Sequence, residues 1–72
     1  MNWHPISRQR FRCLRKQGEG LTIAGGCIYS STGGAIGTYV VWLKNGQPYL
    51  KHELYYNGEE LFFIQAERNA LP

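Results

Sequence analysis

The chain has 72 residues, of which 43% are hydrophobic and 18% charged, and this balance is typical of a folded domain rather than of a disordered chain. A chain of this length forms one domain with a thin core, which leaves little room for a deep catalytic cleft. The net charge is +3 and the pI about 9.1; because no stretch approaches the roughly 18 apolar residues of a membrane span and the N-terminal segment is charged where a signal peptide is apolar, we expect a cytoplasmic protein.

The positive charge is concentrated near the N-terminus. Five of the eight basic residues fall within residues 8–16, which contain no acid. They are Arg8, Arg10, Arg12, Arg15 and Lys16. A like-charged run of this density attracts polyanions. We therefore divide the single domain 1–72 into a basic N-terminal segment, residues 1–18, and a β-meander, residues 21–67.

Residues 7–17 fit two secondary structures. As a helix, Ser7 is the N-cap, Gly18 follows the last turn, and Phe11 with Leu14 forms a narrow apolar stripe. As a strand, alternation places Arg8, Arg10 and Arg12 on one face. The strand is the preferred interpretation, with the helix as its alternative.

The next segment, residues 21–30, alternates apolar and other residues and predicts a strand. Gly25-Gly26 within it suggests a bulge or bend, and residues 30–34, Ser-Ser-Thr-Gly-Gly, read as a loop that leads into a further strand. The glycine-rich stretch at residues 32–37 is interpreted as a connector and not as a phosphate-binding loop, because residues 38–42 that follow it predict a strand and not a helix.

Two Asn-Gly dipeptides give the strongest local signal. Asn45-Gly46 and Asn57-Gly58 are each flanked by alternating apolar residues, the pattern of two-residue hairpin turns of type I′. Two such loops predict three antiparallel strands between residues 39 and 65. Their registers would pair Trp42 with Tyr49 and His52 with Phe63.

This register assigns every side chain of the three strands to one of two faces, because side chains alternate along a strand. The predicted core face consists of Tyr39, Val41, Leu43, Leu50, His52, Leu54, Leu61 and Phe63. The predicted outer face consists of Val40, Trp42, Tyr49, Lys51, Glu53, Tyr55, Phe62 and Ile64. The expected fold is mainly β: a small curved antiparallel meander of four to five strands that can close into a small barrel, with the basic segment as an edge strand or a short helix.

The leading functional prediction is non-catalytic nucleic-acid binding. Guanidinium and ammonium groups match phosphate oxygens, and aromatic side chains stack on bases. The predicted phosphate contacts are Arg8, Arg10, Arg12, Arg15, Lys16 and Lys51, and the predicted aromatic interface is Trp42, Tyr49, Tyr55 and Phe62. The alternative is a protein-protein interaction module, such as a small phage or mobile-element inhibitor or adaptor, that uses the aromatic face or extends its sheet. Exposed apolar area on that face would favour a homodimer.

The sequence contains few residues that suit catalysis or metal binding. The chain has no aspartate, and its two histidines and two cysteines lack the spacing of a metal site, so we expect no enzyme activity, no metal and no cofactor. A ribonuclease acting through arginines and His52 is the catalytic alternative. Cys13 and Cys27 are expected to be reduced, half-buried thiols.

Overall fold

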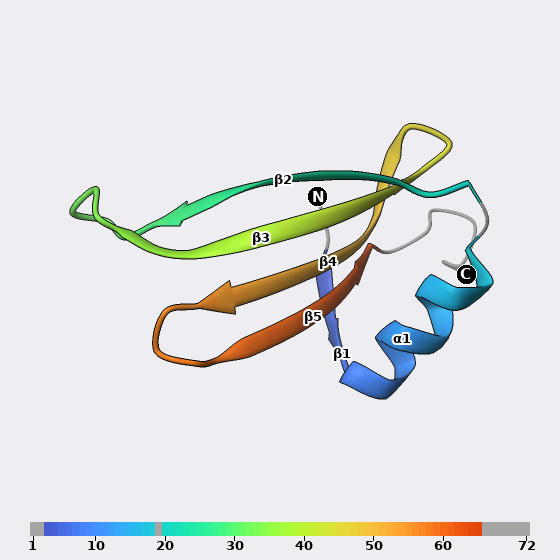
Figure 1. Ribbon diagram of the computed structural model, residues 1–72, viewed down its shortest axis with the longest axis horizontal. Coiled ribbons are helices and arrows are strands. Elements are labelled where there is room, and N and C mark those ends of the chain that lie inside the picture. The colour runs from blue at the N-terminus through green and yellow to red at the C-terminus, as the bar shows by residue number, and fades with distance from the viewer. Residues whose placement is uncertain (1–2, 19, 66–72) are drawn as a thin grey trace.

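The computed structural model describes residues 3–18 and 20–65, which form one five-stranded antiparallel sheet and one short helix (Figure 1). In chain order the elements are β1 (Trp3–Ile6), α1 (Arg8–Gln17), β2 (Thr22–Tyr29), β3 (Ala35–Lys44), β4 (Gln47–Tyr55) and β5 (Glu60–Gln65). The strands lie in the order β1-β5-β4-β3-β2. The mainly β fold and the meander are therefore confirmed, except for residues 66 and 67 of the predicted meander, which lie outside the described residues.

Residues 8–17 of the basic segment form a helix, so the preferred strand interpretation of residues 7–17 is wrong. Ser7 has an extended backbone, and its side chain accepts a hydrogen bond from the backbone N–H of Arg10 at 3.1 Å, which caps the helix. Residues 8–17 contain no β-branched residue, and Phe11 and Leu14, three positions apart, lie on one helical face. The fifth strand is instead β1, which is antiparallel to β5, with Trp3 opposite Gln65.

The first reversal has the predicted geometry. Asn45 (φ 54°) and Gly46 (φ 78°) both adopt positive φ, as a type I′ turn requires, and Lys44 pairs with Gln47 across it. At Tyr49, two residues further along β4, the register departs from the prediction. A bulge opposite Trp42 and Leu43 adds one residue to β4, so that Trp42 pairs with Leu50 and not with Tyr49.

The second reversal is one residue longer than predicted. The backbone N–H of Tyr55 donates to the carbonyl of Glu59 at 2.9 Å, and the N–H of Gly58 donates to the carbonyl of Tyr55 at 3.0 Å. Gly58 has φ 91°, whereas Asn57 is not among the residues with positive φ. The loop is therefore the three-residue type that ends in a left-handed glycine, and His52 pairs with Phe62 and not with Phe63.

Because of these two single-residue shifts, the predicted assignment of side chains to the two faces is wrong. A shift of one residue moves a whole strand's side chains to the other side of the sheet relative to its neighbour. The predicted core residues Leu50, His52 and Leu54 thus share a face with residues that were predicted to be outside. This helix face carries Val40, Trp42, Leu50, His52, Leu54, Phe62 and Ile64, and the opposite, open face carries Tyr39, Val41, Lys51, Glu53, Tyr55, Leu61 and Phe63.

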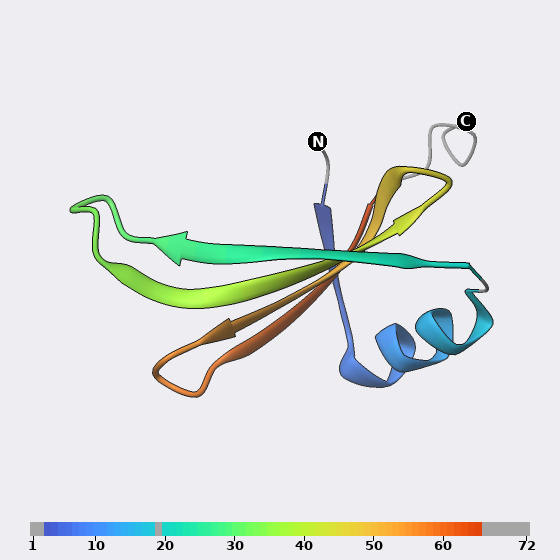
Figure 2. The same cartoon turned by 45° about the horizontal axis from the view of Figure 1, so that its top comes forward.

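Helix α1 covers one end of the helix face (Figures 1 and 2). The core lies between them: Phe11 from the helix is 3% exposed and Leu50 from β4 is completely buried. At the other end of the sheet, where the loops after β2 and β4 lie, no described element covers this face, and Ile36 and Leu54 are exposed.

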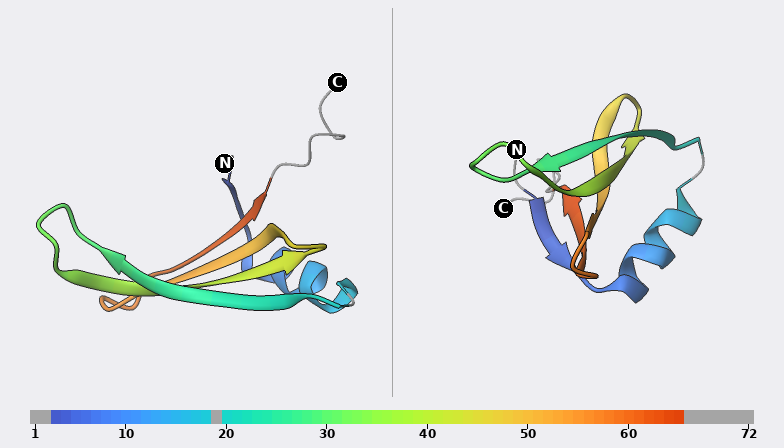
Figure 3. Two further views of the ribbon diagram at one scale, coloured as in Figure 1. Left: turned by 90° about the horizontal axis from the view of Figure 1, so that it is seen from above. Right: turned by 60° about the vertical axis from the view of Figure 1, so that its left-hand side comes forward.

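The sheet is twisted but open, so the predicted closure into a barrel does not occur (Figure 3). β1 and β2 are its two edges, and no described strand pairs with their outer sides. As far as the described chain extends, both edges of the sheet are therefore unpaired.

Candidate functional site

Helix α1 is held on the sheet by one aromatic side chain. The ring centroid of Phe11 lies 4.9 Å from that of Phe62 and 5.2 Å from that of Trp42, the latter in an edge-to-face arrangement. Complete burial of a phenylalanine contributes about 1.5–3 kcal/mol, and aromatic pairs add to this. Phe11 thus determines which side of α1 faces the sheet and, with it, where the basic residues project.

Four of the five basic residues of α1 line one side of the helix. A helix turns by about 100° per residue, so residues 8, 12, 15 and 16 form a contiguous strip beside the Phe11 side, whereas Arg10 projects from the other side. We call this strip the basic flank. It consists of Arg8, Arg12, Arg15 and Lys16. Together with Gln9 and Cys13 these side chains line a hollow on the helix surface.

Two members of the basic flank are fixed by the sheet. The guanidinium of Arg8 forms an ion pair with Glu60 and lies 5.6 Å from the ring centroid of Phe62. The guanidinium of Arg15 lies 5.9 Å from the ring of Trp42. These cation-π contacts hold the planar groups against aromatic faces and leave their outer N–H groups available as donors.

The other two members are more available. Among the ion pairs of residues 3–18 and 20–65, the only one made by α1 is that of Arg8. Arg12 and Lys16 are exposed and one turn apart. The flank therefore presents Arg12, Arg15 and Lys16 as positive charges without an acidic partner in this part of the chain.

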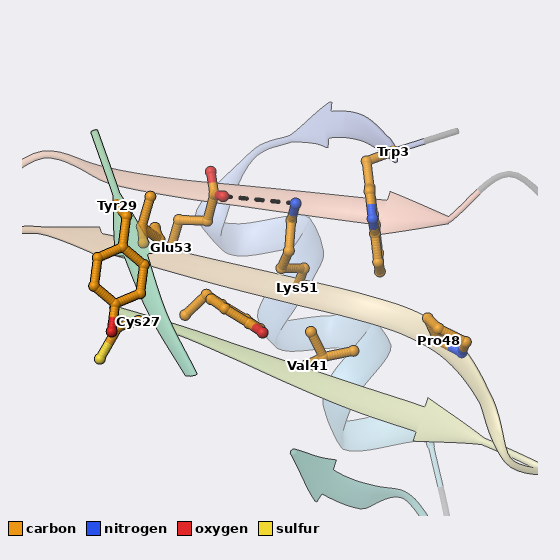
Figure 4. Close-up of a pocket in the computed structure, with 9 residues that line it drawn as sticks. Trp3, Cys27, Tyr29, Val41, Pro48, Lys51 and Glu53 are labelled. Atoms are coloured by element: carbon orange, nitrogen blue, oxygen red, sulfur yellow. Dashed lines mark ion pairs between the residues drawn. The ribbon is translucent and has the colours of Figure 1, made fainter. Parts of the chain in front are cut away.

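Lys51 does not join the basic flank, because it lies on the open face (Figure 4). Its ammonium lies 4.9 Å from the ring of Trp3 and 4.8 Å from that of Phe63, and 3.5 Å from a carboxylate oxygen of Glu53. It borders a hollow of about 480 Å³ that Trp3, Tyr39 and Tyr29 also line. Lys51 is thus neutralised within a local cluster.

Glu53 links this cluster to Tyr55. The hydroxyl of Tyr55 donates a hydrogen bond to Glu53 at 3.2 Å. Partial burial, the charge of Glu53 and this hydrogen bond together raise the pKa of Tyr55 above its ordinary value of 10.0, with a smaller contribution from Glu59. The open face therefore combines aromatic rings with one internally paired lysine and one glutamate.

The four residues of the predicted aromatic interface do not share a face. Trp42 and Phe62 lie under α1 on the helix face, Tyr55 lies on the open face, and Tyr49 lies at the bulge of β4 with the ammonium of Lys44 4.9 Å from its ring. The open face does carry aromatic residues, but Trp3, Tyr39 and Phe63 take the places that had been given to Trp42 and Phe62. Alternation could have placed Tyr39 and Phe63 on this face only with the bulge of β4 and the length of the second loop known, and Trp3 lies in β1, which was not predicted.

His52 also lies on the helix face, stacked on Phe62 rather than paired with Phe63 as the predicted register required. Both cysteines are unpaired, as expected, but they are exposed and not half-buried. Within residues 3–18 and 20–65 no three His, Cys, Asp or Glu side chains gather as metal ligands would. The one helix of the described chain is too short and too polar to cross a membrane.

Comparisons with known proteins give no relative. No protein-family model matches the chain, and no significant match occurs among curated proteins or among solved structures. Its function therefore has to be argued from the two surfaces described above, the basic flank and the open face.

Proposed function

We propose that this protein is a non-catalytic nucleic-acid-binding domain that contacts the phosphate backbone through the basic flank of α1. The observation that carries the proposal is the presence of Arg12, Arg15 and Lys16 on one side of an exposed helix, without a described acidic partner. From residue 8 to residue 16 the flank extends about 12 Å at 1.5 Å per residue. Duplex DNA carries one charge per about 1.7 Å of its axis, so several phosphates fall within this length.

The proposal is narrower than the one drawn from the sequence. The aromatic open face and the basic flank lie on opposite sides of the sheet, so one short nucleic acid does not need to contact both. Phosphate contacts position a nucleic acid without reading its sequence. We therefore expect binding with little base preference.

Salt dependence provides the direct test. With a labelled DNA duplex and fluorescence anisotropy, three phosphate contacts should give a slope of about −2.7 for log K against log salt concentration. The double variant Arg12→Ala with Lys16→Ala should weaken binding at low salt by at least tenfold and reduce the slope to about −0.9.

A charge-matched variant separates a local site from general attraction. Arg10→Ala with Lys44→Ala removes the same total charge, but Arg10 projects from the other side of α1 and Lys44 lies at the first hairpin. This variant should keep most of the affinity and the slope. Equal weakening by both double variants, or no binding of the native chain to the duplex at about 50 mM salt, would contradict the proposal. A protein partner bound by the open face would instead show little salt dependence.

A further inference from the structure

The two edges of the sheet differ in how they are protected. β1 is four residues long and contains Pro5, and α1 follows it directly. β2 is eight residues long and contains neither a charged residue nor a proline. Natural sheets commonly block their edges with lysines, prolines or short strands, because a free edge pairs with other strands. By these criteria β2 is unblocked.

The backbone of β2 also offers a regular set of N–H and C=O groups that pair with no described strand. The N–H of Tyr56 donates to the carbonyl of Ile36 at 3.0 Å, so Ile36 directs its backbone groups toward β4. By alternation Gly37, Tyr39 and Val41 direct theirs toward β2, where they pair with Ile28, Gly26 and Ala24.

The intervening residues of β2 consequently turn their N–H and C=O groups away from β3. These residues are Ile23, Gly25 and Cys27. All three are exposed, and the side chain of Ile23 is 67% exposed. Tyr29 at the end of the strand is 63% exposed. Within the described residues, unpaired backbone groups and exposed apolar side chains therefore coincide on one edge.

From these observations we infer that β2 pairs with β2 of a second copy of this chain and forms a two-fold symmetric dimer. An antiparallel strand paired with itself presents the same surface twice, as a two-fold interface requires. Centring the axis on Gly25 places Gly25 opposite its own copy and Ile23 opposite Cys27 of the second copy. These three residue pairs exchange about six hydrogen bonds at two per pair.

The composition of β2 is compatible with pairing to β2 of a second copy. Because the strand has no charge, no like charges meet across the pair. The glycine at the axis brings no side chain to the centre of the contact. Ile23 and Cys27 point to the same side of the sheet as Trp42 and Thr38, their partners in β3, so the exposed Ile23 side chain lies beside that of Cys27 in the second copy.

The dimer has one consequence that depends on the proposed function. A two-fold axis perpendicular to the sheet keeps both α1 helices on the same face of one continuous ten-stranded sheet. Two basic flanks would then face one nucleic acid. The dimer itself does not depend on this and is tested without nucleic acid.

The first experiment measures mass in solution. Sedimentation equilibrium of the reduced full chain, over a range of concentrations, should show an equilibrium between 8.2 kDa and twice that mass. The combination of Ile23→Lys and Cys27→Lys, which sets lysines opposite one another, should give only the monomer. Tyr56→Lys, at an equally exposed position outside β2, should dimerise as the native chain does.

A second experiment tests the register. In a Cys13→Ser background, Ile23→Cys should form a covalent dimer on mild oxidation, because hydrogen-bonded antiparallel partners have Cα atoms about 5.5 Å apart, within reach of a disulfide. Within one chain positions 23 and 27 are about 13 Å apart along the strand, too far to be bridged.

The outcomes are decisive in both experiments. Cys13→Ser alone should not cross-link, because the two copies of Cys27 lie about 13 Å apart in this register. Cross-linking through Cys27 alone would overturn the register centred on Gly25. A native chain that stays monomeric to millimolar concentration, or a lysine double variant that still dimerises, would overturn the β2 dimer, and neither result would bear on binding by the basic flank.

Discussion

The imidazole ring of His52 lies parallel to the phenyl ring of Phe62, with centroids 4.5 Å apart and an angle of 5° between the planes. Phe11 of the helix lies 6.2 Å from the same imidazole. The Nε2 atom of His52 is buried, has no hydrogen-bond partner among the described residues, and lies 4.0 Å from a carboxylate oxygen of Glu60. His52 therefore acts in this fold as a packing residue with one unpaired polar atom.

Replacing His52 with an apolar residue should not destabilise the domain. His52→Leu keeps a side chain under α1 and removes a buried nitrogen whose desolvation opposes folding by about 1–3 kcal/mol. We expect the free energy of unfolding in urea to stay the same or rise. A loss of more than about 1 kcal/mol would show that the imidazole makes a stabilising polar interaction.

Phe11 should contribute more to stability than any other residue of α1. Phe11→Ala removes the anchor between the helix and the sheet, and such truncations typically destabilise by about 3–5 kcal/mol. Urea unfolding followed by tryptophan fluorescence measures this, because Trp42 contacts Phe11. Cys13→Ala, on the exposed side of the helix, is the control and should change stability by less than about 0.5 kcal/mol. Similar effects of the two substitutions would contradict the packing of α1 on the sheet through Phe11.

Gly37 should not tolerate a side chain. A Cβ atom there would lie 2.6 Å from the carbonyl oxygen of Leu54 and 3.0 Å from the Cα of Tyr55, both backbone atoms of β4 that cannot move independently. Gly37→Ala should therefore lower the thermal midpoint strongly or prevent folding. Gly34→Ala, where the nearest atom is 3.8 Å away and φ is not positive, should be close to neutral. A stable Gly37→Ala variant would show that β3 and β4 pair less closely there.

The raised pKa of Tyr55 predicts a change at alkaline pH. The pKa of Tyr55 is higher in the folded than in the unfolded chain. The contribution of protonated Tyr55 to the free energy of unfolding is therefore fully present below pH 10, and it is lost as the pH rises through the folded-state pKa. Tyr55→Phe should shift the onset of alkaline unfolding to higher pH, as followed by circular dichroism. Tyr56→Phe, at an exposed loop position, should not. Identical profiles for the native chain and Tyr55→Phe would contradict this coupling to Glu53.

Local sequence signals predicted β2 to β5, but they did not predict β1 or which side chains of neighbouring strands share a face. Asn45-Gly46 specified a type I′ turn because both residues accept positive φ. The identical dipeptide at residues 57 and 58 adopts a different loop, in which only Gly58 has positive φ. One dipeptide is compatible with both loop types, and the difference of one residue reverses the orientation of β5.

Composition could not correct this error. β5 contains Leu61, Phe62, Phe63 and Ile64 in succession, so it is apolar on both faces and fits either orientation. The helix could not be distinguished from a strand for a similar reason. Its one buried side chain is Phe11, and a single apolar residue among many charged ones does not show a helical repeat. Tertiary packing determines both the orientation of β5 and the helical state of residues 8–17, because α1 covers the face that carries Trp42, Leu50 and Phe62.

The position of α1 at one end of the sheet has a consequence for the dynamics of the fold. The two most buried side chains, Phe11 and Leu50, lie at that end, whereas Ile36, Leu54 and Tyr56 are exposed at the other. Segments with few buried apolar contacts open locally at lower free energy than the whole domain. Amide hydrogen exchange should therefore be graded along individual strands: slow at residues 50–52 and fast near residues 30–36 and 54–58, so that the meander frays from its uncovered tips while the end under the helix remains closed.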